Sequence, residues 1–562
     1  MSWTHWLAHR PRVLLPGVIA LAVFGTSCSF RRDVPGVALE SINAADMAQY
    51  VKVLSSDRFG GRGPSSPGED SSINFIRAQF VKLGLRPGND TSYFQAVPLV
   101  RSTVTDTTAA LDIRGKGIFH RFHFGTDYIA WTKRVADTVG FWNAPMVFVG
   151  YGIVAPEYHW NDYAGVDAHG KVVVMLVNDP GYATQDTALF RGNTMTYYGR
   201  WTYKFEEAAR QGAIGALIIH ETGAAGYPWT VVRNSWSGPQ FELEAADSNA
   251  SRAAVEGWLT DSSAQALFQQ AGLDLDQEAK RAARPGFTAV PLELYASTHL
   301  DNAIQRSVSH NVLGVLPGTD HRNEYLIYTA HWDHFGTDST LTGDQIFNGA
   351  RDNATGVAAL IELAKAFKAL GTPPARSVLF LAVTAEERGL LGSEYYAEHP
   401  VYPLNETVAD INMDAMNIFG PTHDIVVVGL GNSQLDEYVE EAAKEQGRVV
   451  RPDAEPQKGY YYRSDHFSFA KVGVPALDPN VGVDNVDHGE AWGRAQLADY
   501  TEHRYHTPAD EYSPSWDLRG MVQDVRLLFR VGYRLVMSHD FPDWRPGVPF
   551  KALRDSMMQA AQ

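Results

Sequence analysis

Five side chains of the kinds that bind metal ions are spread over the second half of the sequence. Two are imidazoles and three are carboxylates: His331, Asp352, Glu387, Asp414 and His506. Most of them follow directly after an apolar, strand-like run. Neutral imidazole and carboxylate are the nitrogen and oxygen ligands that zinc and similar divalent ions bind in proteins. The set therefore predicts a metal centre.

The charges in this set favour two ions over one. Two divalent ions carry about four positive charges, and three carboxylates with one bridging hydroxide offset about four. Glu386, the neighbour of Glu387 in "TAEERG", is then left over. We expect Glu386 to act as a general base, because adjacent residues that leave a strand point in different directions. Asp333, two residues after His331, is expected to accept the second N–H of that imidazole.

Each of these residues also has an ordinary structural explanation. An acidic pair at a strand end can begin a solvated helix, whose N-terminus favours negative charge. Asp352 in "ARDNATGV" can be a helix N-cap, and His331 alone can be an ordinary histidine. The prediction of a metal centre therefore depends on the ligands occurring together.

Strand-like and helical patterns alternate between these residues. "NEYLIYTAH" and "SVLFLAVTA" are continuous apolar runs, which are typical of strands buried on both faces of a sheet. Between them a helical pattern is formed by Val357, Leu360, Ile361, Ala364 and Phe367. The alternation predicts an α/β fold, with a mostly parallel central sheet sandwiched by helices. In such folds, ligand sites form at the carboxyl ends of the strands.

Two regions precede this alternating part. Residues 41–85 have the pattern of two helices around a loop rich in Gly, Pro and Ser. From residue 127 to 298 the pattern changes to short apolar strands separated by Gly, Pro, Asn and Asp. We therefore predict an N-terminal part of the catalytic domain at 35–126, an inserted β-rich domain at 127–298 and the main α/β domain at 299–545.

The N-terminus has the pattern of an export signal. "HRPR" supplies positive charge, and residues 13–24 form an apolar run that is too short to span a bilayer. The only cysteine, Cys28, follows at the expected cleavage point and resembles the lipid-modified cysteine of bacterial lipoproteins. Residues 1–28 are expected to be a signal peptide of the lipoprotein type, with the mature protein in the periplasm, anchored to the outer membrane. Simple cleavage without lipidation is the alternative.

The composition excludes one class of partner. The chain has 562 residues, of which 44% are hydrophobic, so it can bury a large core. Its 65 acidic and 48 basic residues give a formal net charge of −17, and no stretch gathers enough Lys and Arg to follow a phosphate backbone. Nucleic acid is therefore not an expected partner. A single cysteine also allows no internal disulfide.

Several stretches in the second half resemble one known family, the co-catalytic di-zinc exopeptidases. The family includes bacterial leucyl aminopeptidase, aminopeptidase Y and glutamate carboxypeptidase. The stretches occur in order over residues 310–515: "HWDH", "ARDNATGVAALIELA", "TAEERGLLGSEYY", "INMDAMN", "YYRSDHFSFAKVGVPAL" and "YHTPADEY". The resemblance implies a phosphorylase/hydrolase-like zinc peptidase fold, two zinc ions per chain and peptide substrates.

The resemblance also implies a role for each ligand. Asp352 would bridge the two ions. The other four ligands would divide between the two sites, His331 and Asp414 at one, Glu387 and His506 at the other.

The same resemblance assigns the groups around the ions. Glu386 would be the general base and Asp333 the partner that orients His331. The peptide bond between residues 352 and 353 would be cis. Tyr461 stands where related enzymes have a tyrosine that donates to the developing oxyanion, although packing is an equally ordinary role for it.

The inserted region resembles a protease-associated domain, on the stretches "MVFVGYGIVAPEYHWNDYAGVDAHGKVVVMLVNDPG" and "KFEEAARQGAIGALIIHE". This domain is a β-rich lid in the family. Its aromatic segment "TYYGRWTY" either faces the catalytic cleft or packs in a domain interface.

The expected activity is removal of N-terminal residues from peptides, because an N-terminal amine suits the carboxylates near the metals. A carboxypeptidase of the glutamate carboxypeptidase type is the alternative, since Arg351 and Arg463 lie beside site motifs and a terminal carboxylate needs such a cation. A glutaminyl cyclase would share the fold, but such an enzyme resembles a single-zinc protein, and the presence of all five ligands argues against it. A binding lipoprotein without catalysis is opposed by the intact pair Glu386 and Glu387.

Overall fold

The computed structural model describes residues 33–105 and 109–560. The predicted signal segment, with Cys28, lies outside the described residues, so its assignment stays a prediction. From Val34 onward the chain forms one compact unit. Within the described ranges, no helix is both long and apolar enough to cross a membrane.

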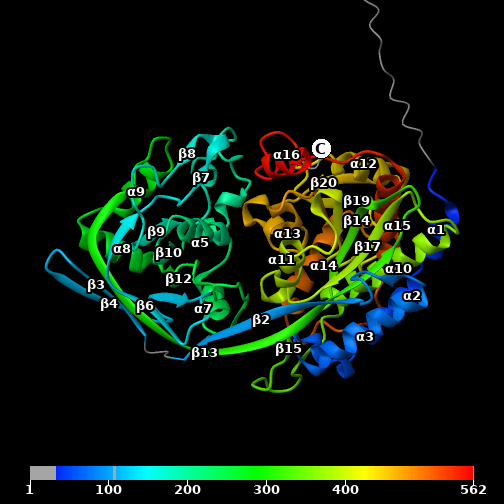
Figure 1. Cartoon of the computed structure of the whole chain (residues 1–562), viewed down its shortest axis with the longest axis horizontal. Helices are drawn as coiled ribbons and strands as arrows, with labels where there is room; N and C mark the ends of the chain where they lie inside the picture. The colour runs from blue at the N-terminus through cyan, green and yellow to red at the C-terminus, as the bar shows by residue number, and fades with distance from the viewer. Residues whose placement is uncertain (1–32, 106–108, 561–562) are drawn as a thin grey trace, which may run out of the picture. The chain divides into compact units, whose positions relative to one another are not determined.

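Four parallel strands form the centre of the main sheet (Figure 1). Strand β14 (His321–His331) lies between β17 (Arg376–Val383) and β18 (Thr407–Asn412), and β21 (Ala476–Asn480) follows β18. The carboxyl-terminal end of β13 (Val290–Leu316) pairs with β17 in the antiparallel direction. The predicted α/β fold with a mostly parallel sheet is confirmed.

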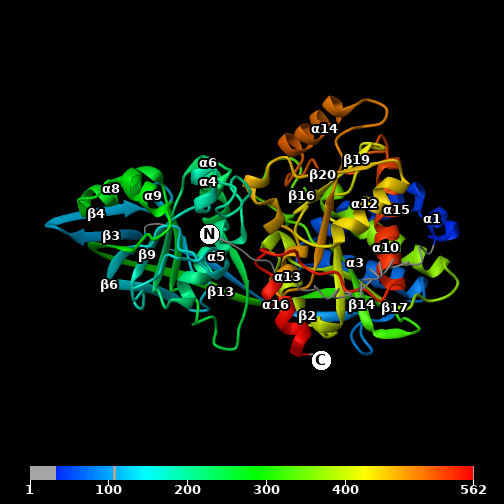
Figure 2. The ribbon, with the colours of Figure 1, turned by 90° about the horizontal axis from the view of Figure 1, so that it is seen from above.

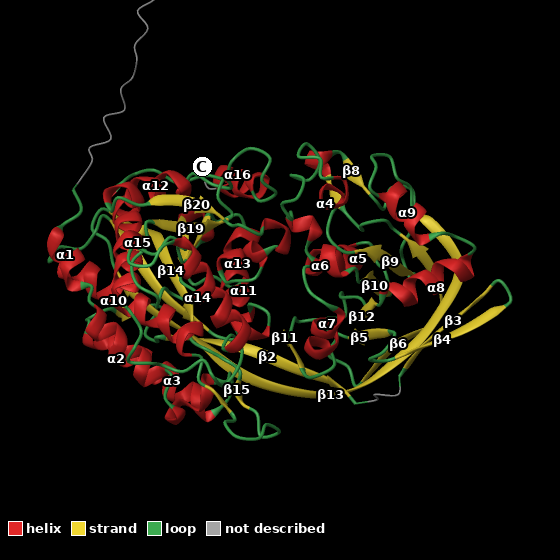
Figure 3. Ribbon diagram, turned by 180° about the vertical axis from the view of Figure 1, so that it is seen from behind, coloured by secondary structure: helices red, strands yellow, loops and turns green. Residues whose placement is uncertain are grey.

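The central strands are buried on both faces, as their continuous apolar runs predicted. All eight residues of β17 are buried, and alternate side chains enter two different hydrophobic clusters. Helices α10 (Thr355–Ala369) and α15 (Arg519–Met537) contribute to the cluster on one face. Helices α11 (Leu391–Glu398) and α13 (His466–Lys471) contribute to the cluster on the other face. Figure 3 shows these helices beside the strands.

Helix α10 is buried more completely than its helical pattern suggested. The predicted inner-face residues are buried, but so are Ala358, Ala359 and Leu363. Helices α1 (Gly36–Ser41) and α2 (Ala44–Leu54) pack against α10 and cover the side that faces away from the sheet. The N-terminal helical segment predicted from the sequence therefore completes the core of the main domain.

Residues 109–300 build a second sheet with its own hydrophobic clusters. Strands β9 (Val172–Leu176), β10 (Gly215–Ile219) and β12 (Val255–Leu259) are parallel, and β6 (Thr138–Phe148) pairs with β9. Helix α5 (Trp201–Arg210) adds Tyr203 and Phe205 to these clusters. The three apolar runs predicted as strands in this region are therefore strands, and the region also contains helices.

Strand β13 is shared between the two sheets (Figures 1 and 2). Its first half pairs with β6, its middle with β2 (Phe94–Val104) and its last residues with β17. The boundary predicted at residue 298 falls inside this continuous strand, and Leu111 and Phe122, upstream of 127, already belong to the second region's core. The domain limits and the protease-associated assignment stay predictions.

Candidate metal centre

Three parallel strands deliver most of the predicted ligands to one edge of the main sheet. His331 is the last residue of β14. Glu386 and Glu387 follow the end of β17, and Asp414 follows the end of β18. Because the carboxyl ends of parallel strands lie at the same edge, residues more than 80 positions apart in the sequence meet there.

Asp352 reaches the same place from the turn before α10. Its backbone is not helical, with φ −108° and ψ 94°, and α10 begins only at Thr355, so Asp352 is not an N-cap. The carboxylate of Asp510 accepts the N–H groups of Arg351 and Asp352 at 3.0–3.1 Å. The peptide bond between Asp352 and Asn353 is cis, as the resemblance implied.

The two carboxylate oxygens of Asp352 face two different pairs of side chains. His331 Nε2 lies 3.3 Å from Asp352 Oδ1 and 3.3 Å from Asp414 Oδ1. His506 Nε2 lies 3.3 Å from Asp352 Oδ2 and 3.2 Å from Glu387 Oε2. All five predicted ligands therefore lie together, divided by Asp352 into the two groups that the resemblance implied.

These separations fit divalent metal ions. A tetrahedral zinc ion with bonds of about 2.0–2.1 Å holds its ligand atoms about 3.3 Å apart. The separations of 3.2–3.3 Å around Asp352 match that value. Ligand atoms of His331, Asp352 and Asp414 form one potential site within 4.8 Å, and those of His334, Asp352 and Glu387 form another. The donor set and its spacing suit zinc.

The pKa shifts of His331 and Asp352 indicate that the centre carries an excess of negative charge. Burial alone would lower the pKa of the His331 imidazole, but the charges of Glu386 and Asp414 raise this pKa well above its usual value. Burial tends to raise the pKa of Asp352, yet hydrogen bonds from His331 and His506 hold it well below its usual value. A buried group of carboxylates therefore needs cations to balance it.

Glu386 lies at the edge of the ligand group, in a position suited to a proton acceptor, and its ligand atom also falls within 4.8 Å of those of His331 and Glu387. Its carboxylate lies 3.9 Å from His331 Nε2, farther than the carboxylates of Asp352 and Asp414. Burial, opposed by His331 and reinforced by Glu387, raises the pKa of Glu386 well above its usual value. A carboxylate with a raised pKa holds a proton more readily, which is what a general base requires.

Asp333 lies beside His331, but its carboxylate does not make the predicted contact. The backbone carbonyl oxygen of Asp333 lies 3.2 Å from His331 Nδ1, whereas the Asp333 carboxylate is 3.9 Å away. That carboxylate instead accepts the N–H of Glu386 at 3.1 Å. Asp333 therefore orients the imidazole through its main chain and the Glu386 backbone through its side chain.

Tyr461 is not brought to the centre by any described contact. Its ring packs on Tyr462 and His466 in a separate hydrophobic cluster. It is absent from the lining of the cavity at Glu386 and Glu387. The oxyanion role stays a prediction, and the packing alternative describes the observed surroundings.

Two positioning residues were missed from the sequence. His334 is fully buried, and its Nδ1 lies 2.5 Å from Glu387 Oε1. The histidine that ends "HWDH" is the signal that could have found it. Ser464 donates a 2.7 Å hydrogen bond to Asp414 Oδ2. These contacts hold two ligands in place.

A third missed residue, Arg62, lies fully buried behind the centre. Its guanidinium donates to the carbonyl oxygens of Leu54, Trp332, Asn348 and Gly349 at 2.5–3.0 Å. Trp332 follows His331, and residues 348–349 precede Asp352. Burial lowers the pKa of Arg62 to about 10, so the group stays charged at neutral pH. Arg62 therefore links the segment that carries Asp352 to the segment that carries His331.

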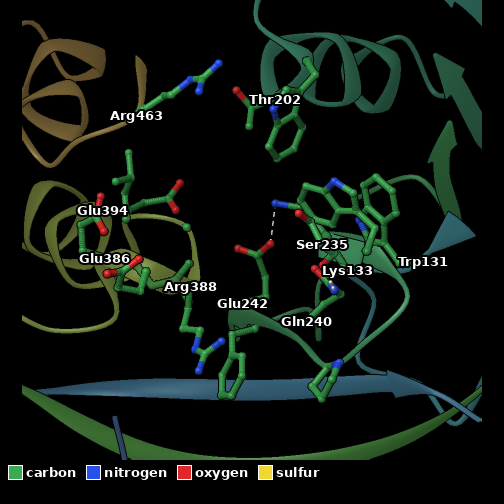
Figure 4. Close-up of a pocket in the computed structure, with 18 of the residues that line it drawn as sticks. Trp131, Lys133, Thr202, Ser235, Gln240, Glu242, Glu386, Arg388, Glu394 and Arg463 are labelled. Carbon is green, nitrogen blue, oxygen red and sulfur yellow. Dashed lines mark hydrogen bonds and ion pairs between the residues drawn. The ribbon is translucent and has the colours of Figure 1, made fainter. Parts of the chain in front are cut away.

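The centre opens into a cavity of about 630 Å³ between the main domain and residues 131–252. Glu386, Glu387 and His506 line it from the main domain. Trp131 and Thr202 line it from the second region, and Figure 4 shows these two residues opposite Glu386. Helices α5 and α13 lie side by side in Figures 1 and 2, and Lys471 of α13 contacts Glu206 of α5 at 2.9 Å. The cavity has room for a small peptide.

Comparison with known proteins agrees with this geometry. Residues 311–529 match the family described as "Peptidase family M28". Aminopeptidase YwaD of Bacillus subtilis (strain 168) is 26% identical over 212 residues, which cover 37% of this chain and 41% of that protein. Aminopeptidase NAALADL1 of Mus musculus is 34% identical over 164 residues, 28% of this chain and 20% of that protein. The chain thus spans less than half the length of these curated relatives.

Two further comparisons bear on function and fold. The probable glutamate carboxypeptidase LAMP1 of Arabidopsis thaliana is 30% identical over 193 residues, 31% of this chain and 26% of that protein. The solved structure of the aminopeptidase from Aneurinibacillus sp. strain AM-1 has a TM-score of 0.50 and 20% identity, and covers 90% of this chain and 97% of that one. At 20% identity, the likeness to the Aneurinibacillus structure concerns the fold alone.

All five predicted ligands and Glu386 lie within the matched residues 311–529. The family match, the aminopeptidase relatives and the shared fold agree with the resemblance to zinc exopeptidases predicted from the sequence. Residues 311–529 are therefore similar to peptidase family M28.

Proposed function

We propose that the protein is a zinc-dependent aminopeptidase that hydrolyses N-terminal residues from peptides. One observation carries the proposal: Asp352 presents its two carboxylate oxygens to two separate histidine and carboxylate pairs at 3.2–3.3 Å. The aminopeptidase relatives support it.

The proposal includes two zinc ions per chain. His331 and Asp414 would hold one ion, Glu387 and His506 the other, and Asp352 both. When bound, the ions would supply positive charge that lowers the pKa of water and stabilises negative charge on a carbonyl oxygen. Two ions carry about four positive charges and the three carboxylates carry three, so the centre is close to balance.

The protein's own residues manage the proton. Glu386 takes a proton from the attacking water, because its carboxylate lies beside the ligand group, 3.9 Å from His331 Nε2. It then gives that proton to the leaving amine. The hydrogen bond from the Glu386 N–H to Asp333 holds this backbone in place, so that the carboxylate stays beside His331.

The surroundings of the centre favour an amine at the substrate terminus. Glu386, Glu387 and Asp414 lie at the centre, and the first two line the cavity. A protonated N-terminal amine is attracted to such a group of carboxylates. The second candidate is a carboxypeptidase, which the arginines of the cavity and the relative LAMP1 favour.

Hydrolysis of two substrate types tests the proposal. Leucyl 4-nitroanilide has a free amine and no carboxylate, whereas an N-acetylated acidic dipeptide has carboxylates and no free amine. An aminopeptidase releases nitroaniline and leaves the blocked dipeptide intact. The reverse pattern would assign the protein to the carboxypeptidases.

The export signal and the lipid anchor at Cys28 are also part of the proposal. The sequence pattern of residues 1–28 supports them. Radiolabelled palmitate should enter the full-length protein in a bacterial host, and Cys28→Ala should abolish the labelling. Labelling of the variant to the same extent would refute an anchor at this residue.

A further inference from the structure

The second sheet has one face that is open to solvent near strand β4 (Ile118–His123). There β4 pairs with β3 (Ala110–Gly115), β3 pairs with β13, and β13 pairs with β6. Figure 3 shows β3 and β4 as a hairpin near helices α8 (Asp261–Ala271) and α9 (Leu275–Ala282). Side chains of these two helices join the inward side chains of the strands in one hydrophobic cluster. The helices therefore cover the inward face of the four strands.

Three aromatic side chains lie on the outward face. Trp142 is 79% exposed, Phe119 is 52% exposed and Tyr295 is 43% exposed. The strand register places Phe119 opposite Arg114, and Arg114 opposite Tyr295, so these side chains form one row across the sheet. Trp142 follows on β6, the next strand. Exposed apolar groups that lie together on one surface mark binding sites more often than single ones do.

A β-bulge presents Trp142 to solvent. The register of β6 against β13 shifts between Ala296 and Thr298, so that Trp142 and Asn143 both lie opposite Ser297. Asn143 has a left-handed backbone, with φ 51°, and its N–H donates to Ser297 Oγ at 2.8 Å. Bulges of this kind redirect side chains and are frequent beside functional sites. Packing of the core does not explain this bulge, because the side chain that it redirects lies outside the core.

The charges on this face are mostly paired with one another. Arg121 donates two parallel hydrogen bonds to Asp112, at 2.7 and 2.8 Å. Lys116 pairs with Glu293 at 2.5 Å. With Arg114, these three basic and two acidic side chains leave a net charge of only one. The face therefore has little charge to offer to a strongly ionic ligand.

Two of these arginines hold an aromatic ring in place. The guanidinium carbon of Arg114 lies 5.5 Å from the ring centre of Phe119, and that of Arg121 lies 5.8 Å from the same ring centre. Cations at this distance are attracted to an aromatic ring. The Phe119 ring is therefore positioned without any covering segment.

The size and charge of the face argue against two common occupants. A stable dimer buries about 20–30 residues of each partner, and the outward side chains of four short strands are far fewer. A membrane with anionic lipids would be repelled by a protein whose formal net charge is −17. A small neutral ligand fits the face better than a second copy or a lipid surface.

The chemistry of the face suits a sugar. One side of a sugar ring carries C–H groups, which pack on aromatic rings, and its edge carries hydroxyl groups. Between the aromatic rings of this face lie groups that donate and accept hydrogen bonds, among them the Asn143 amide, the Ser297 hydroxyl and the Asp112 carboxylate. Aromatic and polar groups are therefore interleaved, as a sugar chain requires.

We propose that the outward face of β4, β3, β13 and β6 binds a chain of neutral sugar units. The rings of Phe119, Tyr295 and Trp142 stack on the sugar rings, and the side chains of Asp112 and Asn143 bind hydroxyl groups. A β-1,4-linked chain fits best, because its extended shape follows the flat face of a sheet. None of the three aromatic residues lines the cavity at the metal centre, so this site is separate from the proposed peptidase site.

Titration calorimetry with three oligosaccharides tests the site in the wild-type protein. Cellohexaose and chitohexaose are neutral and β-1,4-linked, and hexagalacturonate carries a carboxylate on every ring. We expect at least one neutral oligosaccharide to bind with a Kd between about 10 μM and 1 mM, and hexagalacturonate to bind more weakly. Tighter binding of hexagalacturonate, or no binding of either neutral oligosaccharide at about 1 mM, would overturn the proposal.

Substitutions test the residues. Trp142→Ala and Phe119→Ala should each raise the Kd about 10-fold or more. Trp492→Ala is the matched control, because Trp492 is a half-buried tryptophan of α14 (Glu490–His503) in the main domain, where it packs on His488 at 4.4 Å. The control should keep the Kd of the wild type. Equal urea unfolding midpoints would show that the Trp142 and Phe119 variants are folded, and an unchanged Kd in both would overturn the assignment.

Two further measurements identify a different occupant. Analytical ultracentrifugation reports self-association, and flotation with vesicles of phosphatidylethanolamine and phosphatidylglycerol reports membrane binding. If the wild type binds neither neutral oligosaccharide but forms a dimer or binds vesicles, and Trp142→Ala abolishes that association, the face serves a second copy or a membrane and the proposal is wrong.

Discussion

Replacing Arg62 should weaken both the fold and the metal centre. Its guanidinium makes four hydrogen bonds to the carbonyl oxygens of Leu54, Trp332, Asn348 and Gly349 in a fully buried position. Arg62→Met would remove all four hydrogen bonds, and only the Gly349 carbonyl would keep a donor, the N–H of Ala354 at 3.2 Å. An unsatisfied buried acceptor costs about 1–3 kcal/mol, so the other three carbonyls at the low end cost about 3 kcal/mol.

The same substitution should also lower the affinity of the centre for zinc. Three of the four carbonyls belong to the segments that carry His331 and Asp352, and loss of a group that orients ligands usually lowers metal affinity about 10- to 100-fold. Urea unfolding would measure the change in stability, and competition with a chromogenic chelator would measure zinc affinity.

Arg58→Met is the matched control for this prediction. Arg58 lies in the same short helix, Asp57–Arg62, but it is exposed. Its replacement should change the free energy of unfolding by less than about 0.5 kcal/mol. If Arg62→Met is as stable as this control and binds zinc as tightly as the wild type, the reasoning about Arg62 is refuted.

Three further predictions concern the centre and the cavity. Glu386→Gln should lower kcat by about 10²- to 10⁴-fold with zinc content preserved, whereas Glu387→Gln should lower zinc content, and the opposite pattern in kinetics and elemental analysis would show that the two roles are exchanged. His334→Ala should raise the zinc dissociation constant about 10- to 100-fold, because His334 contacts the Glu387 carboxylate at 2.5 Å, and an unchanged constant in chelator titration would exclude this role. Lys471→Ala should cost about 1 kcal/mol in urea unfolding, because Glu206 loses its 2.9 Å partner but keeps the hydrogen bond from the Tyr197 hydroxyl, and no change would mean that this ion pair is not stabilising.

The main sheet and the ligand positions could be predicted from the sequence because local patterns encode them. Two continuous apolar runs and one helical pattern predicted β14, β17 and α10. A parallel sheet brings the ends of its strands to one edge, so His331 and Glu387 had to lie near each other once the strands were identified. The five metal ligands could then be predicted, because imidazole and carboxylate are the side chains that bind zinc.

Contacts between distant segments were not predictable in this way. Arg62 lies 270 residues from Trp332, and no local pattern marks a buried arginine that binds carbonyl groups. Asp333 was expected to use its carboxylate, but spacing along the chain does not distinguish a carbonyl from a carboxylate two residues away. The extent of β13 was missed because one strand serves two sheets, and its polar residues hide the continuity.

The number of zinc ions per chain tests the account most directly. Elemental analysis of the purified protein, repeated after chelation and addition of zinc, should give two zinc ions per chain, and Asp352→Ala should hold fewer than one, because both sites share this carboxylate. A wild-type protein that is fully active with one zinc ion per chain, or an Asp352→Ala variant that keeps two, would contradict the account.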